Sequence, residues 1–118
     1  MSWNLTTYKS VYLQLIDIIQ EKILAGEYKP GEKLPGVREM AADAAVNPNT
    51  MQRALAELER TGLLYTQRTN GRFVADDSSL ILKAKNRLAE HEVENFVQHM
   101  QQLGFTKDEL RTLMEHYL

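Results

Sequence analysis

The chain has 118 residues, a length that accommodates one domain, or one small domain with an accessory element. Its 14 Lys and Arg residues against 16 Asp and Glu residues give a net charge of −2, so total charge does not indicate a polyanionic partner. The lack of cysteine excludes disulfides, thiolate nucleophiles and Cys-ligated metal sites. No apolar run approaches the roughly 18 residues of a membrane span, and the N-terminus does not follow the order of a signal peptide. We therefore expect a cytoplasmic protein without a membrane partner.

The first predicted helix extends from about Tyr8 to Ala25. Apolar side chains recur in it at three- and four-residue spacing, which is the periodicity of one buried helix face. The members of this stripe are Tyr12, Leu15, Ile16, Ile19 and Ile23. Gly26 is expected to end the helix. We interpret Trp3, Tyr8 and Tyr12 as aromatic anchors that pack the N-terminal segment.

Residues 28–36 contain two prolines and two glycines, which predicts a rigid connection rather than a helix. A short helix is predicted over residues 37–44, with Val37, Met40 and Ala41 facing the core. Gly36 precedes this helix as its N-cap, and glycine offers no side-chain oxygen to accept a hydrogen bond from the first turn.

The next helix begins with the most informative junction of the chain. Asn47 is a favoured N-cap residue, and Pro48 occupies the first helical position, where a missing N–H costs nothing. The helix is predicted to reach about Thr61, with Gly62 closing it as the C′ residue. Its expected buried face consists of Met51, Ala54, Leu55 and Leu58.

Two short strands are predicted to follow, over residues 63–67 and 72–75. Residues 68–71 connect them, and the dipeptide Asn70-Gly71 is typical of hairpins. The order helix, short helix, helix and hairpin describes a winged helix-turn-helix domain in residues 1–76. The expected fold is thus mainly α with a small β-hairpin, followed by C-terminal α-helices.

Residues 77–118 are predicted to be helical and to form a dimerisation region. From Leu82 onward, residues spaced alternately by four and three positions form a heptad seam, which is typical of helices that pair with another helix. The seam consists of Leu82, Asn86, Ala89, Val93, Phe96, Met100 and Leu103. Asn86 either fixes the register of a homodimer or lies exposed at the start of the helix. Gly104 ends this helix, and Thr106 with Glu109 forms the capping box of a last one.

The helix that follows Asn47 carries forked polar side chains on the face directed away from the core. The residues of this face are Asn49, Thr50, Gln52, Arg53 and Ala56. Asn and Gln pair with adenine through two hydrogen bonds, Arg pairs with guanine, and a small Ala permits close approach. In a winged helix-turn-helix this helix enters the major groove, so the cluster favours binding of double-stranded DNA.

Three segments carry a resemblance to a known family: PGEKLPGVREMA at residues 30–41, VNPNTMQRAL at 46–55 and LERTGLL at 58–64. Together they resemble the DNA-binding domain of GntR-family transcription regulators over roughly residues 8–75. The middle segment and the short C-terminal helical part are similar to the YtrA-type subfamily.

This resemblance implies a bacterial homodimeric repressor that binds a palindromic operator, often upstream of its own transporter operon. It also implies that the short helix, the first turn of the recognition helix and the tip of the hairpin touch DNA. The candidate DNA-contact residues are Arg38, Asn47, Pro48, Asn49, Thr50, Gln52, Arg53, Asn70, Gly71 and Arg72.

Two positions depart from the family pattern. Gly36 stands where the family usually has Ser, and this removes a hydroxyl that could cap the short helix and bind a phosphate. Arg72 stands where the wing usually has a small hydroxyl residue, so it either strengthens a phosphate or minor-groove contact or is a solvated charge. Two other arginines have local alternatives, since Arg38 can pair with nearby acidic side chains and Arg53 with Glu57 one turn away.

Other classes of function are less well supported. With no thiol, no Gly-Xaa-Ser-Xaa-Gly motif and no histidine before His91, we expect no enzyme. His91 and His99 lie eight positions apart rather than three or four, so no metal or cofactor is expected. The alternative function is a winged-helix module that docks a protein instead of DNA, and such a module would expose an apolar patch. A small-molecule effector bound between protomers stays open.

Overall fold

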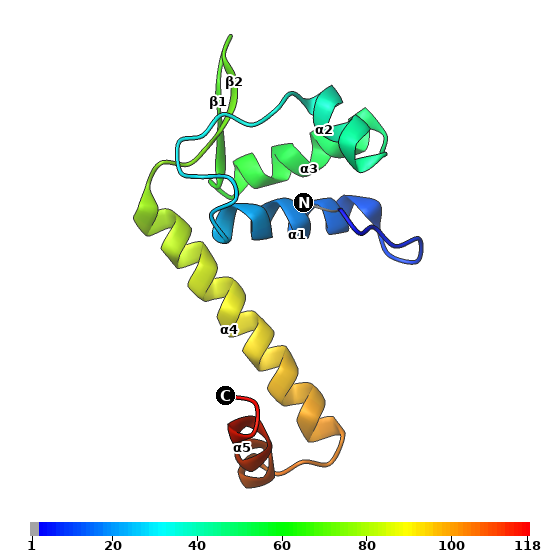
Figure 1. Ribbon diagram of the computed structural model, residues 1–118, viewed down its shortest axis with the longest axis vertical. Helices are drawn as coiled ribbons and strands as arrows, with labels where there is room; N and C mark the ends of the chain where they lie inside the picture. Colours follow the sequence, from blue (N-terminus) through cyan, green and yellow to red (C-terminus); the bar gives the residue numbers. More distant parts are fainter. Residues whose placement is uncertain (1–2) are drawn as a thin grey trace. The chain divides into compact units, whose positions relative to one another are not determined.

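A computed structural model describes residues 3–118, so residues 1 and 2 of the predicted first domain lie outside the described part (Figure 1). The elements are α1 (Val11–Leu24), α2 (Val37–Ala44), α3 (Pro48–Arg60), β1 (Leu64–Gln67), β2 (Gly71–Val74), α4 (Ser78–Gln102) and α5 (Lys107–Glu115). They form two compact units, of which the first extends to Lys83 and the second from Ala84 to Leu118. This division lies inside α4, a few residues beyond the predicted boundary between residues 76 and 77.

The first helix begins later than predicted because a cap precedes it. The hydroxyl of Ser10 accepts a hydrogen bond from the backbone N–H of Leu13, and α1 starts at Val11. Tyr8 therefore lies before the helix, with 82% of its surface exposed, and its prediction as a packing anchor is wrong. The side-chain amide of Gln14 holds this arm instead, since it accepts from Thr6 N at 2.8 Å and donates to Thr6 O at 3.0 Å.

Trp3 does anchor the N-terminal arm. Its ring is buried, and its Nε1 donates a hydrogen bond of 2.8 Å to Oδ2 of Asp43 on α2. The ammonium of Lys22 on α1 lies 3.8 Å from the centroid of the same ring, and that lysine is itself buried. Burial raises the pKa of the neighbouring Tyr28 phenol, with a further contribution from the charge of Glu27. The arm thus connects α1 with α2.

The core of the first unit is built around α3, which contacts α1, α2 and β1 (Figure 1). The face predicted to be buried is confirmed: Met51, Ala54, Leu55 and Leu58 are all buried. Leu15, Ile19 and Ile23 of α1 are buried as well, as the apolar stripe predicted. Burying one such side chain contributes about 1.5 to 3 kcal/mol, so this packing fixes the rotation of α3 and with it the direction of the opposite face.

A tight turn joins α2 to α3. Ala45 adopts a left-handed conformation with φ of 58°, and its N–H bonds back to carbonyls of α2. Asn47 is the N-cap of α3, since its side chain accepts a 2.8 Å hydrogen bond from Asn49 N, and Pro48 is the first helical residue. At the other end Gly62 has φ of 87°, a conformation that favours glycine. Both predicted ends of α3 are confirmed.

The hairpin is antiparallel and pairs Leu64 with Val74, Tyr65 with Phe73, Thr66 with Arg72 and Gln67 with Gly71. Gly71 thus belongs to β2, and only residues 68–70 form the connection, whereas the predicted connection included Gly71. The reason is that Asn70 N donates to Gln67 O at 2.8 Å, which turns the chain before Gly71. The rings of Tyr65 and Phe73 stack across the strands with centroids 5.7 Å apart.

The proline-rich connection before α2 runs along the outer edge of β2. Val74 N donates to Glu32 O at 2.9 Å, Gly31 N to Val74 O at 3.0 Å, and Leu34 N to Arg72 O at 2.9 Å. The sequence predicted a rigid loop here and did not show this pairing. Because the paired segment leads directly into α2, it holds the start of α2 beside the hairpin.

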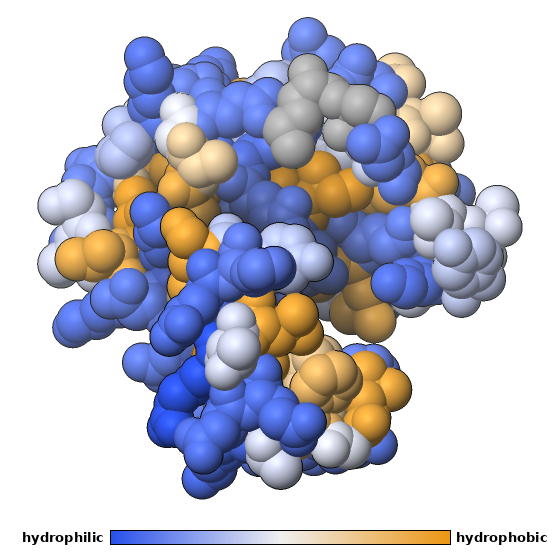
Figure 2. All heavy atoms as spheres, turned by 60° about the horizontal axis from the view of Figure 1, so that its bottom comes forward, coloured by the Kyte–Doolittle hydropathy of each residue, from blue (hydrophilic) through white to orange (hydrophobic). Residues whose placement is uncertain are grey.

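In the second unit, the predicted capping box is confirmed. Thr106 Oγ1 accepts from Glu109 N, and the Glu109 carboxylate accepts from Thr106 N, which begins α5. Leu110 of α5 is buried, whereas large apolar side chains on both helices stay at the surface (Figure 2). No helix in residues 3–118 is long and apolar enough to cross a membrane.

Candidate nucleic-acid interface

The exposed face of α3 collects the polar side chains that the sequence predicted. Asn49, Gln52 and Arg53 are exposed, and their spacing of three and four residues places them on one face. Thr50 is half-buried beside them, and Ala56 continues the same face one turn later. The opposite side of α3 is buried in the core, so the packing of the first unit directs this face to solvent.

The N-terminus of a helix favours negative charge, because its first backbone N–H groups have no partner within the helix. At the N-terminus of α3, Asn47 Oδ1 accepts the hydrogen bond of Asn49 N. Arg38 on α2 is exposed, and within residues 3–118 it makes neither a hydrogen bond nor an ion pair. The alternative pairing of Arg38 with nearby acidic side chains is therefore absent from the described part of the chain.

Arg53 has a partner that its local sequence does not reveal. Its guanidinium carbon lies 4.4 Å from the centroid of the Tyr12 ring on α1, in a cation–π arrangement. The alternative ion pair with Glu57 is wrong, because Glu57 binds Arg60, with Nη2 and Oε1 2.5 Å apart. The hydrogen bonds from Arg60 hold the pKa of Glu57 below its ordinary value. Arg53 thus keeps its guanidinium N–H groups available.

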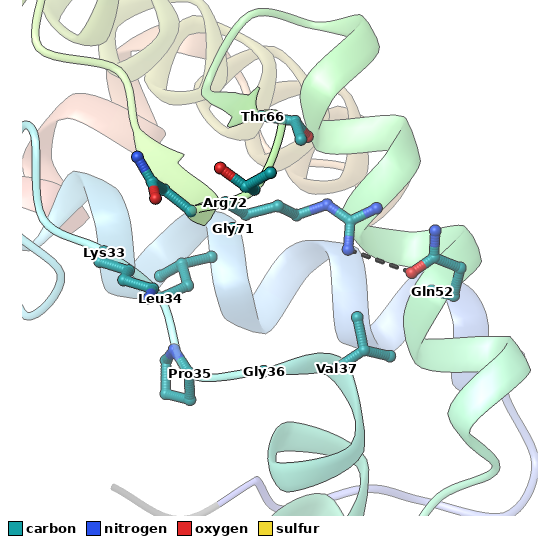
Figure 3. Close-up of a pocket in the computed structure, with 11 residues that line it drawn as sticks. Lys33, Leu34, Pro35, Gly36, Val37, Gln52, Thr66, Gly71 and Arg72 are labelled. Atoms are coloured by element: carbon teal, nitrogen blue, oxygen red, sulfur yellow. Dashed lines mark hydrogen bonds between the residues drawn. The ribbon is translucent and has the colours of Figure 1, made fainter.

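Arg72 of β2 is not a solvated charge, because two side chains of α3 bind it. Its side chain is 16% exposed, and its Nε forms an ion pair with Oε1 of Glu59 on α3. Its Nη1 donates to Oε1 of Gln52 at 3.1 Å (Figure 3). The interpretation of Arg72 as a solvated charge is therefore wrong, because α3 offers a carboxylate and an amide within its reach.

Glu59 is the centre of this network. Thr66 Oγ1 of β1 donates to the same carboxylate oxygen at 2.6 Å. Partial burial raises the pKa of Glu59, but the hydrogen bonds from Thr66 and Arg72 and the charge of Arg72 outweigh it, so the pKa lies below the ordinary value. The carboxylate is therefore charged at neutral pH and ties the hairpin to α3.

A groove with a volume of about 470 Å³ separates the hairpin from the start of α2. Its lining residues are Lys33, Leu34, Pro35, Gly36, Val37, Gln52, Thr66, Thr69, Asn70, Gly71 and Arg72. Figure 3 shows the side chain of Arg72 crossing the groove toward Gln52. Gly36 caps α2 with its backbone only, as predicted, and no atom lies within 4 Å of where its Cβ would be.

The residues of this site that sequence reasoning missed include Tyr12, Lys33, Glu59 and Thr66. For Glu59 a signal existed, since it follows Gln52 by seven positions, or two helical turns, and so lies on the side of α3 that faces the hairpin. Tyr12 was assigned to the core, and its contact with Arg53 depends on how α1 crosses α3. Within residues 3–118, no three His, Asp or Glu side chains gather as metal ligands.

Comparison with known proteins identifies transcriptional regulators as relatives of this chain. Residues 11–74 match the family described as bacterial regulatory proteins, gntR family. The chain is 43% identical to an uncharacterized HTH-type transcriptional regulator, YhcF of Bacillus subtilis, over 86% of this chain and 84% of that protein. It is 38% identical to the HTH-type transcriptional repressor YtrA of the same organism, over 79% and 67% of the two chains.

Solved structures agree with this. A GntR family transcriptional regulator from Listeria monocytogenes superposes with a TM-score of 0.90 at 37% identity, covering 95% of this chain and 98% of that one. The DNA-binding domain of AraR in complex with the operator ORX1 has a TM-score of 0.54 at 30% identity, covering 61% of this chain and 88% of that one. Fold and sequence comparisons therefore lead to the same family.

Proposed function

The chain belongs to the gntR family of bacterial regulatory proteins, and from this premise we propose that it is a homodimeric repressor that binds a palindromic operator. The family and its relatives are transcriptional regulators rather than enzymes. We also propose which residues contact DNA, which interface joins two copies and which kind of gene the protein controls.

The observation that carries the proposal is the two-sided character of α3. One side is buried against α1, and the other presents Asn49, Gln52 and Arg53 to solvent. These three side chains are able to make paired hydrogen bonds to base edges in the major groove. An exposed apolar patch, which the alternative protein-docking module requires, is not what this face offers.

The remaining candidate residues surround this face and have a different role. Arg38 is exposed at α2, and Asn47, Pro48 and Thr50 form the first turn of α3, where backbone N–H groups favour a phosphate. Across the groove lie Asn70, the last residue of the connection, and Gly71 and Arg72, which begin β2. We assign the phosphate contacts to these positions and the reading of bases to Asn49, Gln52 and Arg53, with Gln52 adjusted by the hairpin.

Helix α4, most of which belongs to the second unit, supplies the dimer interface in this proposal. The seam residues Leu82, Val93, Phe96 and Leu103 of α4 are 56%, 57%, 45% and 61% exposed, whereas Met100 is half-buried. Asn86 and Ala89 of the seam are exposed too. Phe96 and Met100 also line an apolar groove of about 400 Å³ between α4 and α5. Several apolar residues of this heptad seam remain at the surface of one chain. Such a surface favours pairing with a second copy that covers it.

Two copies would present two recognition helices, which must lie about one turn of DNA, ~34 Å, apart to bind one face of the duplex. This requirement is why we propose a palindromic operator. We further propose that the protein acts in the cytoplasm and controls a transporter operon. Relatives that carry the word repressor in their names support the repressor assignment.

The experiment that tests the proposal is selection of binding sites from a random pool of DNA duplexes, with the purified protein and no added ligand. A two-fold symmetric motif with half-sites about one helical turn apart is the expected result. Recovery of an asymmetric single site would remove the homodimer from the proposal. Recovery of nothing above background, also with candidate effectors added, would favour the protein-docking module.

A further inference from the structure

The orientation of the Gln52 amide is determined by its neighbour. Arg72 Nη1 donates to Gln52 Oε1 at 3.1 Å. Because a guanidinium has donors and no acceptor, only the oxygen of the amide can face it. The amide nitrogen is accordingly turned away from Arg72 (Figure 3). No hydrogen bond holds that nitrogen within residues 3–118, so it presents its two N–H groups to solvent.

Arg72 is itself held in place from several directions. Its Nε is paired with the Glu59 carboxylate, which Thr66 also binds. Its backbone pairs with Thr66 in the hairpin, and its carbonyl accepts from Leu34 N at 2.9 Å on the other edge of β2. A side chain that is 16% exposed and bound at two of its nitrogens has little rotational freedom. The guanidinium therefore acts as a fixed donor toward Gln52.

We infer that Arg72 is a positioning residue that turns Gln52 into a hydrogen-bond donor toward DNA, so that Gln52 selects guanine rather than adenine. This inference rests on the proposed function, since it concerns how the operator is read. It also revises the expectation from composition alone, in which Gln pairs with adenine.

The reason lies in the edges of the purines. Adenine presents an acceptor at N7 and a donor at its N6 amino group, so a glutamine that reads it must use both its N–H and its oxygen. Guanine presents acceptors at N7 and O6 and requires only donors. Gln52 Oε1 is turned toward Arg72, which binds one of its two lone pairs, so the acceptor is directed at the protein and the amide offers its donors to solvent. A guanine edge matches that arrangement, and an adenine edge leaves its amino group without a partner.

Three proteins test the inference in the same selection from random duplexes. They are the wild type, Gln52→Ala and Arg72→Thr. Gln52→Ala removes the amide from an exposed helix position and so identifies the base pair whose preference depends on Gln52. Arg72→Thr releases the Gln52 oxygen while it keeps a residue suited to a strand opposite Thr66. Competition binding with the selected duplex and its guanine-to-adenine derivative then measures the preference at that base pair.

For the wild type we expect a guanine preference of about tenfold or more over adenine at this base pair, in the range of one well-formed base contact. For Arg72→Thr we expect the ratio to fall to about threefold or less, while preferences elsewhere in the half-site stay unchanged. A melting curve of Arg72→Thr checks that the variant is folded. The wild-type preference at the base pair that Gln52→Ala identifies does not depend on whether Arg72→Thr folds.

Several results would overturn the inference. If the wild type prefers adenine where Gln52→Ala loses selectivity, the amide reads both a donor and an acceptor and Arg72 does not direct it. If Arg72→Thr leaves the guanine-to-adenine ratio unchanged and only weakens binding to all duplexes by the same factor, Arg72 contacts phosphate without directing Gln52. Both leave the proposed function intact, because a symmetric motif is still recovered. Failure of the wild type to enrich any motif would remove the proposed function and this inference together.

Discussion

The guanidinium carbon of Arg53 on α3 lies 4.4 Å from the centroid of the Tyr12 ring on α1. This contact joins an exposed side chain of α3 to a half-buried one of α1. It leaves the N–H groups at the rim of the guanidinium free while its face is covered. Helix α1 therefore contributes to the orientation of a side chain that we propose reads bases.

Replacing Tyr12 by Leu should weaken binding to the selected operator, although we assign Tyr12 no contact with DNA, because the Tyr12 ring orients Arg53. An exposed cation–π contact contributes about 0.5 to 1 kcal/mol, so we expect a loss of about two- to fivefold in affinity. Tyr12→Phe keeps the ring and should bind like the wild type. Titration of labelled operator, followed by fluorescence anisotropy, measures all three proteins. Equal losses for Leu and Phe would show that the hydroxyl and not the ring matters.

Arg53→Ala should reduce sequence discrimination, whereas Arg38→Ala should reduce affinity for all DNA. Loss of a base contact at Arg53 should reduce discrimination between the operator and a mutated operator by about 1 to 3 kcal/mol. Loss of a phosphate contact at Arg38 should weaken binding to every duplex and lower the slope of affinity against salt by about one. Binding isotherms at several salt concentrations, with specific and unrelated duplexes, distinguish the two. Unchanged discrimination in Arg53→Ala would remove that residue from the base-reading set.

The Glu59 carboxylate should make the attachment of the hairpin depend on pH. Its pKa in the folded protein lies below the ordinary value of 4.5, so its stabilising contribution is fully present above about pH 4.5. That contribution is lost as pH falls through the lowered pKa. Urea unfolding at several pH values between 7 and 3 gives the free energy of unfolding of the wild type and of Glu59→Gln. We expect the difference between the two proteins to shrink toward pH 3. A difference in the free energy of unfolding that stays constant with pH would show that Glu59 does not make stability depend on pH.

Truncation of Trp3 should destabilise the first unit. The ring is buried and binds Asp43 and Lys22, and replacing a buried Trp by Ala costs about 3 kcal/mol. Tyr8→Ala is the matched control, because this aromatic residue of the same arm is 82% exposed and should leave stability unchanged. Chemical denaturation of the two variants measures the difference. Equal stability of both would mean that the arm does not contribute to folding in solution.

The proposed dimer interface is tested by a charge in the seam. Val93 is 57% exposed, so Val93→Glu should leave the chain folded but bring two carboxylates into an apolar interface. We expect a shift from dimer to monomer in sedimentation equilibrium and a loss of operator affinity. Gln98→Glu, at an exposed position of the same helix outside the seam, adds the same charge and should remain dimeric. A dimeric Val93→Glu would place the interface elsewhere.

Several helix ends in both units could be predicted because their signals are local. The caps at Asn47 and Gly62 define α3, and the capping box at Thr106 defines the start of α5, because each acts within a few residues of its own position. The stripe of apolar residues at helical spacing indicated which face of α3 is buried. That choice also predicted the exposed polar face, since the two faces of one helix exclude each other.

The identity of the exposed side chains on α3 was therefore determined by the sequence, but their partners were decided by tertiary structure. Arg72 and Gln52 are 20 positions apart, and Trp3 and Asp43 are 40 apart. Several acidic and amide side chains lie at similar distances along the sequence from each of these donors. The sequence near the donor therefore does not indicate which of them it binds. Only the pairing of the hairpin with residues 31–34 and the crossing of α1 with α3 bring particular donors and acceptors within hydrogen-bond distance.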